Sequence, residues 1–132
     1  MNKQRLLELA GVVVPETGHH TNIEKDTLDN TNFRKVLFTA NNTQLVVMSL
    51  KPGEDIGMET HDDTTQFLRF EAGEGKCLIG NKEYKVKDGD SVIIPQGSKH
   101  NVTNTSDSDA LKLYSLYSPP VHKDGLTEKT KN

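Results

Sequence analysis

The chain has 132 residues, a formal net charge of −3 and a mean hydropathy of −0.65. This length corresponds to one domain, and the small negative charge gives no attraction for nucleic acid or anionic membranes. No stretch approaches the ~20 apolar residues that a membrane helix needs. We therefore expect neither nucleic acid nor a membrane among the partners of this protein.

Residues 1–32 are expected to form an N-terminal extension, partly irregular, with a short helix or an edge strand. The apolar residues 6–14 follow a basic start, but Glu8 interrupts them, so they make a poor signal peptide. A cytoplasmic location is therefore the default. The apolar residues 12–14 could add to the sheet of a second copy, and we expect a homodimer.

From residue 33 onward, short apolar segments alternate with turn residues, which is typical of an all-β protein. These segments leave no room for crossover helices, so we expect an antiparallel sheet that is closed or sandwiched. Residues 119–132 are polar after two prolines and are expected to form a flexible tail. The expected strands cover residues 33–40, 44–51, 65–71, 76–79, 83–87, 91–94, 100–104 and 110–118.

The only cysteine, Cys77, excludes an internal disulfide and suits a reducing compartment. It lies in an apolar segment, so we expect a thiol packed in the core rather than a reactive one. His19 and His20 lie in a polar segment and are expected at the surface.

Two ordered spacings occur between residues 53 and 104. The first is Gly53-x5-Glu59-x-His61-x4-Gln66-x6-Gly73, and the second is Gly89-x5-Pro95-x-Gly97-x2-His100-x3-Asn104. Together they resemble the two motifs of the cupin superfamily, and more loosely the small cupins similar to mannose-6-phosphate isomerase. The resemblance implies an antiparallel double-stranded β-helix, the jelly-roll barrel, over residues 33–118 with a metal site inside.

The resemblance also implies a divalent metal ion at the family's four ligand positions, which here are Glu59, His61, Gln66 and His100. Glu59 stands where the family usually has a histidine, and Gln66 where it usually has a glutamate. Burying Glu59 unpaired would be costly, whereas a divalent cation compensates its charge. Zinc, iron, manganese and nickel all stay open for this donor set. Any one of these residues alone would more simply be a solvated surface group.

The alternation of side chains along a strand predicts what surrounds this site. Gln66 shares its face with Leu68 and Phe70, and His100 shares its face with Val102. These three apolar residues are therefore expected to line the pocket beside the polar groups.

Tyr114 and Tyr117 take opposite faces of the last long strand, so one of them should reach the interior. A buried phenol could donate a proton to a substrate, which makes both tyrosines candidate catalytic residues. The alternative is a packing role with a satisfied hydroxyl group.

These features favour a small metal-dependent enzyme that acts on an oxygen-rich small molecule, of the isomerase or dioxygenase type. The alternative is a non-catalytic protein that binds or stores a small, sugar-like molecule. An enzyme should place an acid or base group near the bound substrate, and a binding protein need not. Arg69 faces away from Gln66 by the strand alternation, which disfavours a sugar phosphate because phosphate groups prefer Arg or Lys.

Overall fold

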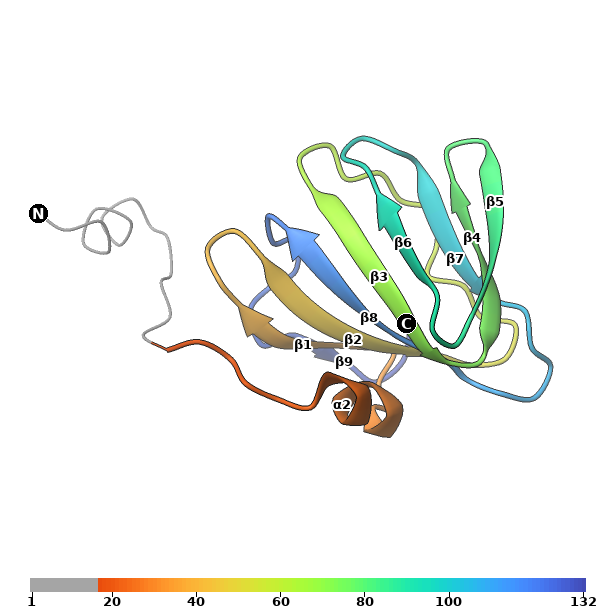
Figure 1. The fold of residues 1–132 in the computed structure, drawn as a ribbon, viewed down its shortest axis with the longest axis horizontal. Coiled ribbons are helices and arrows are strands. Elements are labelled where there is room, and N and C mark those ends of the chain that lie inside the picture. The colour runs from red at the N-terminus through yellow and green to blue at the C-terminus, as the bar shows by residue number, and fades with distance from the viewer. Residues whose placement is uncertain (1–16) are drawn as a thin grey trace, which may run out of the picture.

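The computed structural model describes residues 17–132, which contain one short helix and two antiparallel β-sheets (Figure 1). Each strand expected from the sequence is present, and its ends agree within about two residues with those expected. The helix is α2 (Ile23–Asp29), and the strands are β1 (Arg34–Thr39), β2 (Gln44–Leu50), β3 (Thr65–Ala72), β4 (Glu74–Ile79), β5 (Lys82–Lys87), β6 (Ser91–Ile94), β7 (His100–Asn104), β8 (Leu111–Ser118) and β9 (Thr127–Glu128).

The larger sheet has the strand order β6-β3-β8-β2-β1-β9, and the smaller sheet has the order β5-β4-β7. All of these strand pairs are antiparallel. Strands distant in the sequence lie side by side, as β2 and β8 do in the larger sheet (Figure 1). This arrangement confirms the antiparallel jelly-roll fold predicted from the alternating segments.

The hydrophobic core lies between the two sheets and receives side chains from both. Phe70 and Leu113 are opposite each other on β3 and β8, and both are fully buried. Cys77 and Val102 are opposite each other on β4 and β7, and they belong to the same buried cluster. Burying one such large apolar side chain stabilises a fold by roughly 1.5–3 kcal/mol. We therefore expect the packed core to hold the barrel together in the absence of a bound ligand.

Helix α2 packs on the larger sheet, with contacts to β2, β3 and β8. The side chain of Asn22 caps its first turn, where the Asn22 Oδ1 atom accepts a hydrogen bond from the Lys25 backbone N–H at 3.0 Å. At the other end, Lys112 Nζ on β8 donates to the carbonyl oxygens of Leu28 and Asn30 at 2.7 and 2.8 Å. No helix within residues 17–132 is long and apolar enough to cross a membrane. Residues 12–14, the expected dimer edge, lie outside the described residues.

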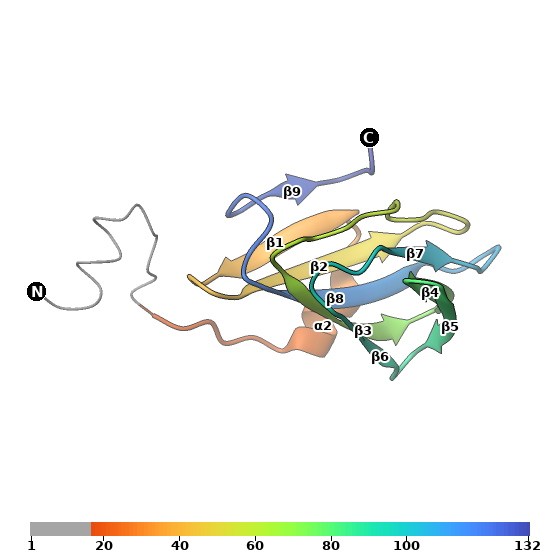
Figure 2. The same ribbon diagram turned by 90° about the horizontal axis from the view of Figure 1, so that it is seen from above.

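The C-terminal segment differs from the flexible tail expected from its polar sequence. Strand β9 pairs with β1 at the edge of the larger sheet, as Figure 2 shows. The buried Gln44 amide holds the start of the segment: it donates to the His122 carbonyl oxygen at 2.8 Å and accepts from the His122 N–H at 3.0 Å. Polar segments are usually mobile because they bury little apolar surface, but here specific hydrogen bonds replace that burial.

Candidate metal centre

The loop before β3 runs beside β7 and brings the two sequence motifs together. Glu59 and His100 are directly opposite each other, and each backbone N–H donates to the other residue's carbonyl oxygen at 2.9 Å. Further along, the Ile56 N–H donates to the Val102 carbonyl oxygen at 2.9 Å. Directly opposed residues of an antiparallel pair point their side chains to the same face. The Glu59 and His100 side chains therefore meet although 40 positions separate them in the sequence.

Three predicted metal ligands lie close together, as the sequence predicted. One ligand atom from each of Glu59, His61 and His100 lies within 4.8 Å of the others. The two imidazole ring centres are 5.2 Å apart, and His61 Nε2 is 3.1 Å from Glu59 Oε2. His100 is buried, whereas the Glu59 and His61 side chains are 34% and 18% exposed. Solvent therefore reaches one side of the cluster.

Both histidines are arranged as a metal ligand requires. His100 Nδ1 is 2.9 Å from the Ser98 carbonyl oxygen, which can only accept, so Nδ1 carries the proton and Nε2 keeps its lone pair. His61 Nε2 is buried and makes no well-aligned hydrogen bond. Burial lowers the pKa of His61 more than the neighbouring Glu59 carboxylate raises it, which favours the neutral, metal-binding form. The residues therefore fit a divalent cation.

The fourth predicted ligand, Gln66, lies on the interior face of β3 and is buried. Its Nε2 atom donates to Ser115 Oγ at 3.3 Å, and its Oε1 atom has no hydrogen-bond partner. Leaving a buried oxygen unpaired costs about 1–3 kcal/mol, so a ligand or ion that contacts it would recover that energy. The direct contact of Gln66 with a metal stays a prediction.

Replacing Gln66 with glutamate should tighten divalent metal binding if Gln66 is a ligand. An anionic oxygen binds hard cations more strongly than an amide oxygen, and the two side chains have nearly the same shape. Competition with a chelator measures the metal dissociation constant. Gln96→Glu is the matched control, because Gln96 is exposed and the substitution adds the same charge. Equal effects of the two variants would mean that Gln66 does not contact the metal.

The structure places Tyr117 inside the barrel and Tyr114 outside it. Tyr117 is buried, and its ring meets the His61 ring edge-on at 5.9 Å. Burial raises the pKa of Tyr117 to about 12, so the phenol keeps its proton and can donate a hydrogen bond. Tyr114 instead packs near Phe67 on the outer face, with ring centres 6.4 Å apart. The strand alternation therefore turns Tyr114 away from the site, which leaves Tyr117 as the candidate catalytic tyrosine.

The three expected pocket-lining residues lie on the interior face, but they are deeply packed. Leu68, Phe70 and Val102 are fully buried members of the hydrophobic core. They therefore belong to the packed interior of the barrel and do not line an open pocket. Asn104, the last residue of the second motif, is also structural, because its Nδ2 atom donates to the carbonyl oxygens of Leu50 and Asp109 at 3.0 and 2.8 Å.

The residues expected away from the site behave as predicted. Cys77 is buried, and burial raises the pKa of its thiol to about 11, which keeps it unreactive. His19 and His20 are exposed, and His19 stacks on Phe38 with ring centres 5.1 Å apart.

Sequence reasoning gave no role to His122, which the structure brings next to the site. The His122 ring meets the Tyr117 ring edge-on at 5.0 Å, and its Nε2 atom is buried without a hydrogen-bond partner. Burial, together with the smaller effect of the positive charge of Arg34, lowers the pKa of His122 to about 4. The only signal in the sequence is that His122 follows the last long strand closely, after the turn at Pro119.

Acid should destabilise the metal-free protein partly through His122. Its pKa of about 4 in the folded state lies below the ~6.5 of an unfolded histidine, so the unfolded state binds more protons between these values. Stability should therefore fall as the pH drops from about 6.5 to about 4. Below about pH 4, His122 should contribute no further loss of stability. Urea unfolding at pH 7 and 4.5 with a chelator present measures the loss. Between these two pH values the His122→Asn variant should lose less stability than wild type. An equal loss of stability would show that His122 titrates with the pKa of an ordinary histidine.

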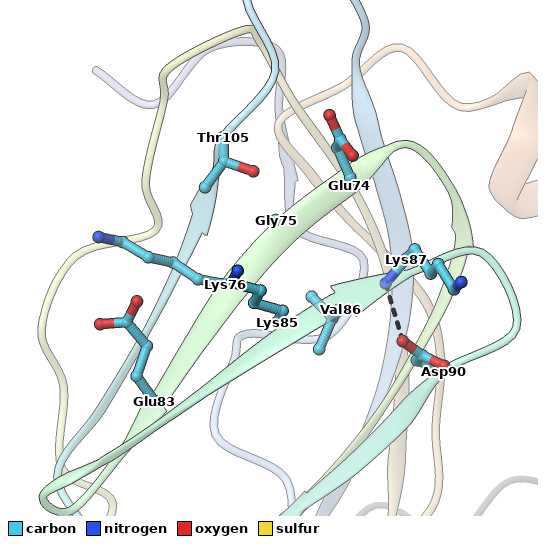
Figure 3. A pocket seen from close by; sticks show the side chains of 9 residues that line it. All are labelled: Glu74, Gly75, Lys76, Glu83, Lys85, Val86, Lys87, Asp90 and Thr105. Carbon is cyan, nitrogen blue, oxygen red and sulfur yellow. Dashed lines mark hydrogen bonds between the residues drawn. The ribbon is translucent and has the colours of Figure 1, made fainter.

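A separate hollow lies on the smaller sheet, along β4 and β5 (Figure 3). Its charged lining residues are Glu74, Lys76, Glu83, Lys85, Lys87 and Asp90. Acidic and basic side chains are mixed there, and most of them are exposed. The hollow shares no residue with the candidate metal centre and has the character of a solvated surface.

Comparisons with known proteins agree with the fold. A family model described as "Cupin domain" matches residues 46–117. A crystal structure of a Bacillus halodurans protein superposes with a TM-score of 0.85 and is 38% identical in sequence, covering 91% of this chain and 95% of that one.

Two curated relatives cover most of this chain. The Bacillus subtilis protein YrkC is 42% identical over 116 residues, which is 83% of this chain and 62% of YrkC. A protein of Acanthamoeba polyphaga mimivirus is 44% identical over 107 residues, which is 79% of this chain and 67% of that protein. This chain therefore spans about two thirds of the length of each relative.

Proposed function

This chain belongs to the cupin family, and from that premise we propose that it is a metal-binding cupin that acts on an oxygen-rich small molecule. The observation that carries the proposal is the cluster of Glu59, His61 and His100, whose ligand atoms lie within 4.8 Å of one another. The cluster is open to solvent on one side, as a site that exchanges small molecules must be.

The donor set suggests which ions the site would take. Two imidazoles and one carboxylate are typical of sites for non-haem iron and also suit zinc, manganese or nickel. Gln66 would add a neutral oxygen at the fourth position. A divalent ion held there would polarise a ligand oxygen as a Lewis acid.

Two neutral polar side chains beside the cluster support an enzyme of the isomerase or dioxygenase type. Tyr117 lies against His61 and carries a proton that it can share with a bound molecule. His122 lies against Tyr117 and is neutral near pH 7, so a ring nitrogen can accept a hydrogen bond, although its pKa of about 4 makes it a weak base. It is the position of these two groups beside the cluster that supports an enzyme.

The second candidate is a binding or storage barrel without catalysis. The observation that favours it is the high pKa of Tyr117, about 12, because such a phenol cannot act as a base near neutral pH. The same residues would then only orient a bound molecule by hydrogen bonds.

Metal titration followed by a turnover assay tests the proposal. Protein stripped with a chelator is titrated with Zn²⁺, Fe²⁺, Mn²⁺ and Ni²⁺, and one ion per chain is expected for at least one metal. The loaded protein is then incubated with a panel of sugars and hydroxy acids, and NMR follows their conversion, with His100→Ala as the inactive control. Conversion that needs His100 supports the enzyme, binding without conversion supports the storage barrel, and no metal binding contradicts both.

A further inference from the structure

Two buried polar atoms on neighbours of Tyr117, and a third on Arg34, have no hydrogen-bond partner. Within residues 17–132, five buried side-chain polar atoms lack one. Two of them lie close to carboxylates, His61 Nε2 to Glu59 at 3.1 Å and Arg69 Nε to Glu71 at 3.2 Å. The other three, Arg34 Nε, Gln66 Oε1 and His122 Nε2, have no nearby ionic partner of this kind. Unpaired buried polar atoms are rare, so these three call for an explanation.

These three residues come from different parts of the chain, and two of them are neighbours of Tyr117. Gln66 is directly opposite Tyr117 in the pairing of β3 with β8. The His122 ring is 5.0 Å from the Tyr117 ring and approaches it from the C-terminal segment. Arg34 is buried on β1, and its ion pair with Glu128 at 2.7 Å joins it to the same C-terminal segment that carries His122.

Arg34 is a buried cation with a free donor. The residue is 9% exposed, and Arg34 Nη1 donates to Glu128 Oε1 on β9 at 2.7 Å. This ion pair fixes one side of the guanidinium and leaves the Nε–H without an acceptor. A guanidinium is always charged, and its preferred partners are the oxygens of carboxylates and phosphates. Arg69 cannot bind such an oxygen inside the barrel, because it lies on the outer face of β3 next to Glu71.

We propose that Arg34, Gln66 and His122 form a second subsite beside the metal centre, and that it binds the carboxylate and a hydroxyl group of a small hydroxy-carboxylate. The Arg34 Nε–H donates to the carboxylate. The Gln66 amide oxygen has two lone pairs, so one accepts from the hydroxyl group while the other faces the metal ion. His122, a neutral imidazole, offers Nε2 as a further contact. The assignment rests on the proposed function, since it names the class of molecule that would occupy the same site.

The C-terminal segment has a function under this proposal. It carries His122 and Glu128, and both contact residues of the barrel interior, Tyr117 and Arg34. The hydrogen bonds of Gln44 to the His122 backbone hold the segment in place. The segment therefore completes the subsite, and its polar residues make the contacts that hold it there.

Binding of two matched probes to the full chain tests the subsite. Glycerate has a carboxylate where glycerol has its second hydroxymethyl group, so the pair isolates the contribution of the charge. NMR titration measures both dissociation constants for Zn²⁺-loaded wild type, Arg34→Lys and His122→Asn, with the exposed His20→Asn as the control. A separate titration with Zn²⁺ alone measures metal affinity in each protein. Inorganic phosphate is the third probe.

Wild type should bind glycerate at least roughly tenfold more tightly than glycerol, because a charge-assisted hydrogen bond exceeds a neutral one. Arg34→Lys and His122→Asn should each reduce the affinity for glycerate roughly tenfold or more. The Zn²⁺ affinity of both variants should stay within about threefold of wild type. Unchanged glycerate affinity in both variants would overturn the subsite. Tighter binding of phosphate than of glycerate would overturn the carboxylate assignment.

Two further outcomes keep the tests separate. Absence of Zn²⁺ binding in wild type contradicts the proposed function, and the three probes are then compared on the metal-free protein to judge the subsite alone. If Arg34→Lys does not fold, the His122→Asn titration decides, because His122 lies in a terminal segment outside the hydrophobic core.

Discussion

Replacing His100 with alanine should abolish most metal binding, with a loss in affinity of at least roughly 100-fold. Changes to the outer hydrogen-bond partners of metal ligands already cost about 10–100-fold, and this change removes a ligand itself. His100 is the buried member of the cluster, and its tautomer is fixed by the Ser98 carbonyl oxygen. His61→Ala should have an effect of the same size. Chelator competition and elemental analysis of the purified proteins measure both losses.

The exposed His20→Ala is the matched control and should bind metal as wild type does. Both site variants should still unfold cooperatively, because the core is packed independently of the cluster. Metal stoichiometry equal to wild type in either variant would show that the residue is not a ligand. Loss of cooperative unfolding would show instead that the metal has a structural role.

Replacing Phe70 with alanine should destabilise the barrel by about 3–5 kcal/mol, the usual cost of removing a large buried aromatic side chain. Phe70 is fully buried on the interior face of β3, opposite Leu113. Phe67→Ala is the matched control on the outer face of the same strand, where the residue is only half-buried near Tyr114. Urea unfolding at pH 7 measures both changes.

The control should lose markedly less stability than Phe70→Ala. Similar losses for the two variants would mean that Phe70 is not part of the core, and that it faces an open pocket as the sequence suggested. Folded Phe70→Ala protein should keep its metal affinity, because Phe70 offers no ligand atom.

The positions of the strands, and which residues of a strand share a face, were predictable from local patterns. Alternation along β3 and β7 correctly placed Gln66 and His100 inside, because a strand side chain can face only one of two directions. Turn residues marked the strand ends for the same local reason. The resemblance of the two motifs to those of the cupin superfamily predicted that Glu59 and His61 lie near His100, and the loop that carries them does pair with β7.

Which of two opposite faces is buried was not predictable for the last strand. Tyr114 and Tyr117 differ in parity, and both faces of β8 carry apolar residues. The burial of Tyr117 follows from its position opposite Gln66 and Gln44 on the neighbouring strands. That pairing depends on the register of three strands, which no local pattern encodes.

The position of the C-terminal segment also depends on tertiary contacts. Polar composition predicts mobility because it measures only apolar burial. Here the position of the segment is set by the hydrogen bonds of Gln44 with His122 and by the ion pair of Arg34 with Glu128. Arg34 and His122, which we propose as site residues, could not be recognised from the sequence because neither belongs to the two spaced motifs.

Anomalous X-ray scattering from crystals of the Zn²⁺-loaded protein tests the metal centre most directly. We expect one strong peak among the side chains of Glu59, His61 and His100, at about 2.0–2.1 Å from an imidazole nitrogen of each histidine. Zinc bound only elsewhere on the chain, with no peak among these three side chains, would contradict the metal centre.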